Sequence, residues 1–301
     1  MWKRTLAMTL MPVLLGIAQQ DEETRQIFDT HFAQARVAAN PSSAQVAATY
    51  RRFASVGSPK SGVAVAKQTV VQRSAYSESA LGITIWKMLP AAEGDVARLL
   101  VLEGGGRTKT AVTPHRVEAG ELLHLGDQVR LSIETPVGGF LYVVDQEVYA
   151  NGDVGPPYLI FPVMGTRNGE NRVLAGQLVD IPDQRDPVNV FTLQAKDPRD
   201  RGERLTILLS PTPIGGLHLT TEAQQLPAVT FRAWSQQFLS NPEHFELAGG
   251  KGQAWTRAEQ QAGSDPSRLL TLADPAPQTV FVFPGGQGRP VLATIVLKFE
   301  R

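Results

Sequence analysis

From residue 81 to the end, most of the chain consists of short runs of β-forming residues that end at glycine or proline. The clearest run covers residues 128–134, where apolar and polar residues alternate without interruption. This alternation is typical of an antiparallel strand that buries one face and leaves the other in water. Residues 140–144 are apolar on both faces, which predicts a strand in the centre of a sheet.

Similar runs predict further strands at residues 82–89, 96–102, 158–162, 177–181, 190–194, 205–210, 279–283 and 292–299. Short strands separated by turn-forming residues favour a sandwich. The last two runs flank a glycine-rich segment at 285–288, so we expect them to form a terminal hairpin that completes one sheet. The predicted fold is therefore mainly β, an Ig-like or related antiparallel β-sandwich over residues 81–301.

Helical patterns occur at both ends of the chain. Residues 19–56 are predicted to form a short helical segment, because Ile27, Phe28, Phe32 and Ala35 share one helical stripe. A second short helix is expected after Asn40-Pro41. In the C-terminal third, Phe231, Trp234 and Phe238 follow helical spacing, and residues 256–259 have the spacing of a capping box. Residues 57–80 are rich in Gly, Ser and Pro at their start and are predicted to be a linker.

The first 18 residues resemble a signal peptide. Lys3 and Arg4 precede an apolar stretch that ends at small residues, and acidic residues follow from position 21. The apolar stretch is shorter than the roughly 20 residues that span a bilayer. We therefore expect a secreted or periplasmic protein that starts near Gln19 and keeps no stable membrane span after cleavage. A buried N-terminal helix or a membrane anchor is the alternative.

Composition narrows the possible functions. The chain contains no cysteine, which rules out disulfides, thiol catalysis and cysteine–metal sites. Lys and Arg together number 29, as do Asp and Glu, so the formal net charge is zero. A chain without net positive charge is a poor candidate for nucleic-acid binding.

A series of short motifs between residues 113 and 210 resembles the bacterial domain of unknown function 4384. The matching positions are Thr113-Pro114, Gly126-Asp127, 129–134, 139–144, Asn151-Gly152, 159–162, 171–173, 175–176, 181–182 and 203–207. This resemblance implies an exported protein or an accessory domain attached to peptidase or kinase modules. The family has no established activity, so it supplies no catalytic residues.

No catalytic set is evident in the sequence. His115, His124, His218 and His244 are available, but the chain has no Gly-x-Ser-x-Gly elbow. The glycine-rich segment at 249–252 contains a lysine but lacks the rest of a phosphate-binding loop, so we interpret it as a turn. We expect no cofactor.

Two binding hypotheses remain. Asp145, Glu147, Asn151 and Asp153 gather around one predicted turn and could hold a hard cation such as calcium, although we favour the interpretation that they form a solvated hairpin end. A second list of candidates, for a sugar- or peptide-binding face, consists of Trp86, Tyr142, Tyr149 and Tyr158.

The sequence therefore predicts an exported, non-catalytic binding or scaffold module of the cell envelope, with protein or glycan partners. A secreted hydrolase with a dispersed active site, a calcium- or carbohydrate-binding module, and self-association through the N-terminal helices are the alternatives.

Overall fold

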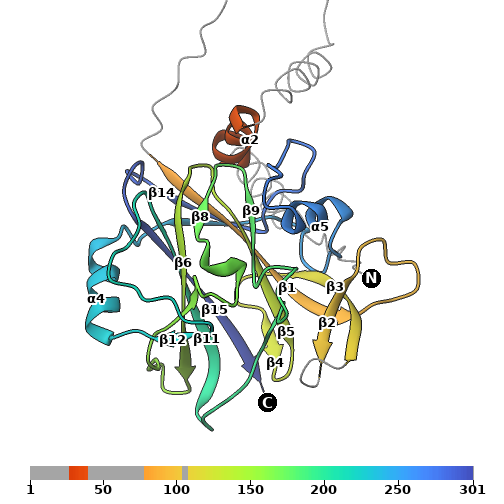
Figure 1. Cartoon of the computed structure of the whole chain (residues 1–301), viewed down its shortest axis with the longest axis horizontal. Helices are drawn as coiled ribbons and strands as arrows, with labels where there is room; N and C mark the ends of the chain where they lie inside the picture. Colours follow the sequence, from red (N-terminus) through yellow and green to blue (C-terminus); the bar gives the residue numbers. More distant parts are fainter. Residues whose placement is uncertain (1–26, 40–77, 104–107, 301) are drawn as a thin grey trace, which may run out of the picture.

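The computed structural model describes residues 27–39, 78–103 and 108–300, which form two β-sheets and a few short helices joined by turns and loops (Figure 1). The predicted mainly β sandwich is confirmed. The predicted signal peptide at 1–18 and the second N-terminal helix lie outside the described residues, as does the linker up to residue 77. In the described ranges, no helix is both long enough and apolar enough to cross a membrane.

The first sheet, sheet A, has eight strands. They are β1 (Ser79–Pro90), β2 (Leu99–Glu103), β3 (Thr108–Val117), β5 (Gln128–Glu134), β9 (Leu178–Ile181), β10 (Phe191–Thr192), β13 (Glu243–Glu246) and β14 (Thr279–Phe283). The long strand β1 is central, because it pairs with β5 along one side and with β14 and then β3 along the other. All pairs in this sheet are antiparallel.

The second sheet, sheet B, has seven strands. They are β4 (Leu122–His124), β6 (Gly139–Tyr149), β7 (Tyr158–Phe161), β8 (Arg172–Val173), β11 (Asp200–Ser210), β12 (Gln224–Gln225) and β15 (Val291–Glu300). Its order is β12-β7-β6-β11-β15-β4, with β8 beside β6. Only the β15–β4 pair among these is parallel.

The main core lies between the two sheets. Alternate apolar residues of nearly every long strand point into it, among them Ile83 and Ile85 of β1, Leu131 of β5, and Ile207 of β11, all at most 1% exposed. Burial of apolar area of this kind is the dominant favourable contribution to folding. The apolar residues of the alternating run 128–134 therefore face the core, as predicted.

The helices cover the outer faces of the sandwich. A π-helical turn, η1 (Asp29–Ala33), continues into α2 (Gln34–Ala39). Two more helices, α4 (Ala228–Gln237) and α5 (Arg257–Ser264), follow in the C-terminal third of the chain. Trp234 and Phe238 at the end of α4 pack on Tyr142 and Leu208 of sheet B. Figure 1 shows α4 and α5 at opposite sides of the molecule. A short 3-10 turn, η3 (Arg167–Gly169), completes the set.

Two local predictions concern the start of α5 and the turn after β6. Thr256 and Glu259 form the capping box at the start of α5. Gly152 takes the positive φ of 85° that the turn after β6 requires, although Asn151 before it does not have a positive φ. The Asn171 side chain donates a hydrogen bond of 3.0 Å to the Leu141 carbonyl and ties its loop to sheet B.

Two predictions are wrong. The strands at the C-terminus do not form a hairpin, because β14 belongs to sheet A and β15 to sheet B. The chain crosses the sandwich between them, which lets both strands bury side chains in the same core. The second error concerns β5, whose polar face was expected to meet water. Arg130, Ser132 and Glu134 are all at most 2% exposed, because other segments cover this face.

Candidate functional site

The covered outer face of sheet A holds an unusual concentration of buried polar side chains. We call it the clamp face and define it by Thr84 and Trp86 of β1, Arg116 of β3, Arg130, Ser132 and Glu134 of β5, and Asp180 of β9. The strand register places these residues side by side, with Trp86 between Arg116 and Arg130, and Ser132 between Thr84 and Asp180. Every one of them is at most 5% exposed.

Three segments cover the clamp face. The first is helix α5, and the second is residues 265–278, which we call the strap. The third is residues 27–39, which comprise η1 and α2 and which we call the arm. Gly82 of β1 permits a close approach of strap and arm, since a Cβ atom there would lie 2.6 Å from the Pro277 side chain and 3.1 Å from Phe32. The sequence thus leaves room on β1 for both strap and arm.

Arg116 connects sheet A to α5 and to the strap. Its Nη2 donates to Glu259 Oε1 at 2.5 Å and to the Ala276 carbonyl at 2.9 Å. The other carboxylate oxygen of Glu259 accepts from the backbone N–H and hydroxyl of Thr256. The guanidinium also lies over the Trp86 ring, 5.4 Å from its centre. Glu259 therefore caps its own helix and fastens that helix to the sheet.

Arg130 and Asp180 form a second buried pair, 3.7 Å apart. Asp180 accepts a hydrogen bond of 2.5 Å from the Ser132 hydroxyl and one of 2.7 Å from the Gln184 amide. Arg130 donates twice to the Asn189 carbonyl. Burial raises the pKa of Asp180, while Arg130 and the two hydrogen bonds act in the opposite direction.

Arg36 of the arm and Glu134 form the third pair. Arg36 Nε and Nη2 donate to the two carboxylate oxygens of Glu134 at 2.7 and 2.6 Å, the bidentate geometry that suits a guanidinium. Both side chains are at most 2% exposed. Burial raises the pKa of Glu134, and the adjacent guanidinium opposes that rise. Removing one member of such a pair leaves an uncompensated buried group, which is strongly destabilising.

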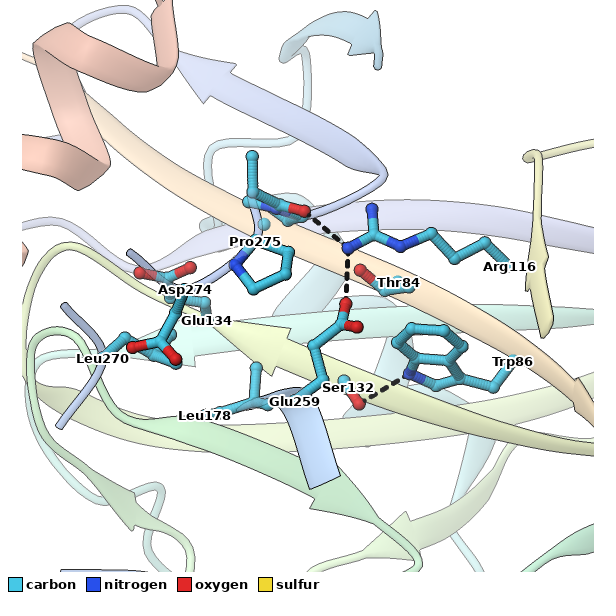
Figure 2. A pocket seen from close by; sticks show the side chains of 13 residues that line it. Thr84, Trp86, Arg116, Ser132, Glu134, Leu178, Glu259, Leu270, Asp274 and Pro275 are labelled. Atoms are coloured by element: carbon cyan, nitrogen blue, oxygen red, sulfur yellow. Dashed lines mark hydrogen bonds and ion pairs between the residues drawn. The ribbon is translucent and has the colours of Figure 1, made fainter. Parts of the chain in front are cut away.

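A small cavity lies among these contacts (Figure 2). Its volume is about 20 Å³, enough for about one water molecule. Figure 2 shows the Arg116–Glu259 pair on one side and the Trp86–Ser132 hydrogen bond beside it. The Ser132 hydroxyl accepts from Trp86 Nε1 at 2.8 Å and donates to Asp180, so it is engaged in both directions. The Ser132 hydroxyl is therefore not a free nucleophile.

The residues of the cation hypothesis lie elsewhere, at one end of the sandwich. Asp145 and Glu147 share a face of β6, whereas Asn151 and Asp153 bond to each other in the turn, with 2.7 Å between amide and carboxylate. Asp145 instead interacts electrostatically with Glu203 of β11. In the part of the chain that the structure describes, no group of three or more His, Cys, Asp or Glu could hold a metal ion. The calcium hypothesis stays a prediction.

Burial affects the titration of this carboxyl pair. It raises the pKa of Asp145 to about 6 and, together with the negative charges of Asp145 and Glu147, that of Glu203 to about 9. Lys196 contacts Glu147 at 3.3 Å and is the cation of this group. Around neutral pH the adjacent carboxyls of Asp145 and Glu203 therefore hold one proton between them.

The four aromatic candidates do not form one face. Trp86 belongs to the cluster on the outside of sheet A and Tyr142 to the cluster beneath α4, each 2% exposed. Tyr149 and Tyr158 lie near the sandwich end, beside Arg199 and Lys196. A binding surface made of all four is therefore ruled out.

The candidate histidines are also dispersed. His124 contacts Glu300 at 3.2 Å, and His244 contacts Glu246 at 2.9 Å on the edge strand β13. His115 Nδ1 donates to the Gly252 carbonyl at 3.0 Å. Among the contacts of the described residues, none of these three histidines is hydrogen-bonded to a serine or threonine hydroxyl.

The clamp face could not be predicted from the sequence, for a physical reason. Arg130, Ser132 and Glu134 have the spacing of an exposed strand face, and only their distant partners show that the face is covered. One signal was present: Arg36 follows Phe28 and Phe32 at intervals of four, so an apolar helical stripe ends in an arginine.

Comparisons with protein-family models, with curated proteins and with solved structures found no match to the chain. The resemblance of residues 113–210 to the bacterial domain of unknown function 4384 therefore stays a prediction.

Proposed function

We propose that the chain is an exported, non-catalytic module of the cell envelope that binds a protein partner on sheet A, at the end of the clamp face that the arm covers. One observation carries this proposal. The charged side chains of the clamp face are matched to carboxylates and to main-chain carbonyls of other segments. Such groups hold polypeptide in place, whereas catalysis needs an acid, base or nucleophile that is free to react.

The hydrolase alternative needs a histidine, a carboxylate and a hydroxyl in one cleft. Glu246 contacts His244 at 2.9 Å and accepts from the Thr279 hydroxyl at 2.9 Å, but the carboxylate lies between the two and Thr279 is buried. In the clamp face, Ser132 donates to Asp180 at 2.5 Å. Its other neighbour is the indole of Trp86, a donor that cannot accept the serine proton. The geometry thus favours binding over hydrolysis.

Site-specific photo-crosslinking in living bacteria tests this proposal. A photoreactive residue replaces Glu243 on the exposed edge strand β13, which is two strands from β1 in sheet A, and a control replaces Lys298, which is exposed on β15 of sheet B. We expect a crosslinked protein adduct from position 243, in the envelope fraction, and none from position 298. Equal adducts from both positions, or a protein found only in the cytoplasm, would contradict the proposal.

A further inference from the structure

The arm contacts the sandwich in the manner of a bound peptide. Phe32 is fully buried in a cluster with Ala80, Val280 and Val282, and Arg36 is buried one turn further on. Residues 40–77 separate the arm from β1 along the sequence. A helix of this length is marginal in water on its own. The arm therefore owes its helical structure to the surface on which it lies.

The site that receives Arg36 uses the whole guanidinium group. Besides the two bonds to Glu134, Nη1 donates to the carbonyls of Thr271 and Asp274 at 3.0 and 2.8 Å, and Nη2 donates to that of Pro275 at 3.0 Å. These contacts satisfy all five N–H groups of an arginine. A lysine has three donors and no planar fork, so it cannot reproduce them. The site is therefore selective for arginine.

The receiving site is fastened without the arm. The strap is held to sheet A by the bond from Arg116 to the Ala276 carbonyl and by the bond from the Gln278 N–H to the Thr84 hydroxyl. Within the strap, Asp274 accepts hydrogen bonds from Arg268 and Thr271. None of these bonds involves the arm, so the strap has its own attachment to sheet A beside the carbonyls that face Arg36.

From these contacts we infer that the surface under the arm is a docking groove for an amphipathic helix of a partner protein. That helix presents aromatic, aromatic and arginine side chains four residues apart, in the pattern of Phe28, Phe32 and Arg36. The arm occupies the groove when the partner is absent and so inhibits binding. This inference rests on the proposed function, because it identifies the kind of partner and how its access is controlled.

Peptide binding to the full-length chain tests the inference. The probe is a fluorescently labelled peptide with the sequence of residues 27–39, and the readout is its anisotropy. The proteins are the wild type and a Phe32→Ala/Arg36→Gln variant, in which the arm binds the sandwich more weakly. A tethered arm competes at an effective concentration on the order of millimolar. We therefore expect the peptide to bind the variant at least about tenfold more tightly than the wild type, since each tenfold is about 1.4 kcal/mol.

A peptide in which the arginine is replaced by lysine is the matched control. We expect it to bind the variant at least about tenfold more weakly, because the fork of hydrogen bonds is lost. Equal binding of the two peptides, or equal and weak binding to both proteins, would overturn the inference.

A second measurement uses the wild type only and does not depend on how the variant folds. Excess unlabelled peptide is added to ¹⁵N-labelled protein, and hydrogen exchange is followed at residues 27–39 of the protein. Faster exchange in these residues supports displacement of the arm, and unchanged exchange overturns it. A wild-type dimer that the Arg36→Gln substitution abolishes would also overturn the inference, since a second copy would then be the occupant. Peptide binding without any adduct in the crosslinking experiment would uphold the groove and contradict only the proposed cellular role.

Discussion

At the scale of single residues, the clamp face depends on positions where a side chain is absent as much as on its charges. A Cβ atom at Gly82 would meet Pro277 of the strap, and one at Gly263 of α5 would lie 2.0 Å from Asp180 Oδ2. Asp180 cannot move aside freely, because Ser132 and Gln184 both bond to it. Glycine at these positions lets the strap and α5 lie directly on the polar face.

Gly263→Ala is accordingly expected to lower the free energy of unfolding by about 1–3 kcal/mol, the usual cost of an overpacked buried site. Gly215→Ala is the matched control, since a Cβ atom there has no neighbour within 4 Å and its φ is not in the left-handed region. Urea denaturation of both variants makes the comparison. Equal stability of the Gly263 and Gly215 variants would show that α5 does not press against Asp180.

The carboxyl pair at the end of the sandwich predicts a dependence of stability on pH. The pKa of Asp145 is raised to about 6 and that of Glu203 to about 9, so both hold protons more tightly in the folded than in the unfolded chain. Their contribution to stability is present below their ordinary pKa values of about 4 and is lost as the pH rises through 6 towards 9.

Glu203→Gln removes one of the two charges that must be buried at high pH. We expect this variant to be more stable than the wild type at pH 8, by about 1–3 kcal/mol, and to lose less of its melting temperature between pH 6 and pH 9. Glu222→Gln, at an exposed position, is the control and should follow the wild type. A wild-type melting temperature that rises over this interval, with no difference in the Glu203 variant, would refute the raised pKa values.

At the scale of elements, strand β5 shows what sequence periodicity can and cannot predict. The alternation over residues 128–134 identifies the strand and its core face correctly, because Leu131 and Ile133 point between the sheets. It says nothing about the opposite face, since a polar strand face can meet water or a polar covering segment. The same limit applies to β14 and β15, whose apolar patterns do not show which sheet each strand joins.

Helix α5 is the element whose local sequence most directly predicts its structure. Thr256 caps its first turn, and Glu259 completes the capping box while also binding Arg116. We expect Thr256→Ala to destabilise the protein by about 0.5–2 kcal/mol, with most of the loss avoided in Thr256→Ser, which keeps the capping hydroxyl. Thermal melts followed by circular dichroism measure both. Identical melting temperatures for the alanine and serine variants would mean that the cap contributes nothing to the fold.

At the scale of the whole molecule, the sequence predicted the architecture better than the site. Glycine, proline and short apolar runs act locally, so each stretch predicts its own strand or turn, and the series of them along the chain predicts a sandwich. The Arg36–Glu134 and Arg116–Glu259 pairs join residues 98 and 143 positions apart, and the single sequence has no pattern that connects them. The groove under the arm can be recognised only in the folded structure, because its residues are far apart in the sequence.

Export is a prediction that concerns the whole molecule. If residues 1–18 are a signal peptide, the protein expressed in a bacterial host is released by osmotic shock, and its first residue is at or near Gln19. N-terminal sequencing of the released protein checks this expectation. A protein that stays in the cytoplasm with Met1 intact would contradict it. The arm, residues 27–39, follows the predicted cleavage site, so the inferred groove is the same whether or not cleavage occurs.

The central claim is that the arm is a separable ligand held to the clamp face by the Arg36–Glu134 pair. Hydrogen exchange of the full-length Glu134→Gln variant tests it, with Glu222→Gln as control. Loss of a buried pair costs about 3 kcal/mol or more, so amides of residues 27–39 should exchange at least about a hundredfold faster. The amides of β6 and β11 should keep their wild-type rates. Unchanged exchange in the arm, or an equal acceleration throughout the sandwich, would contradict the claim.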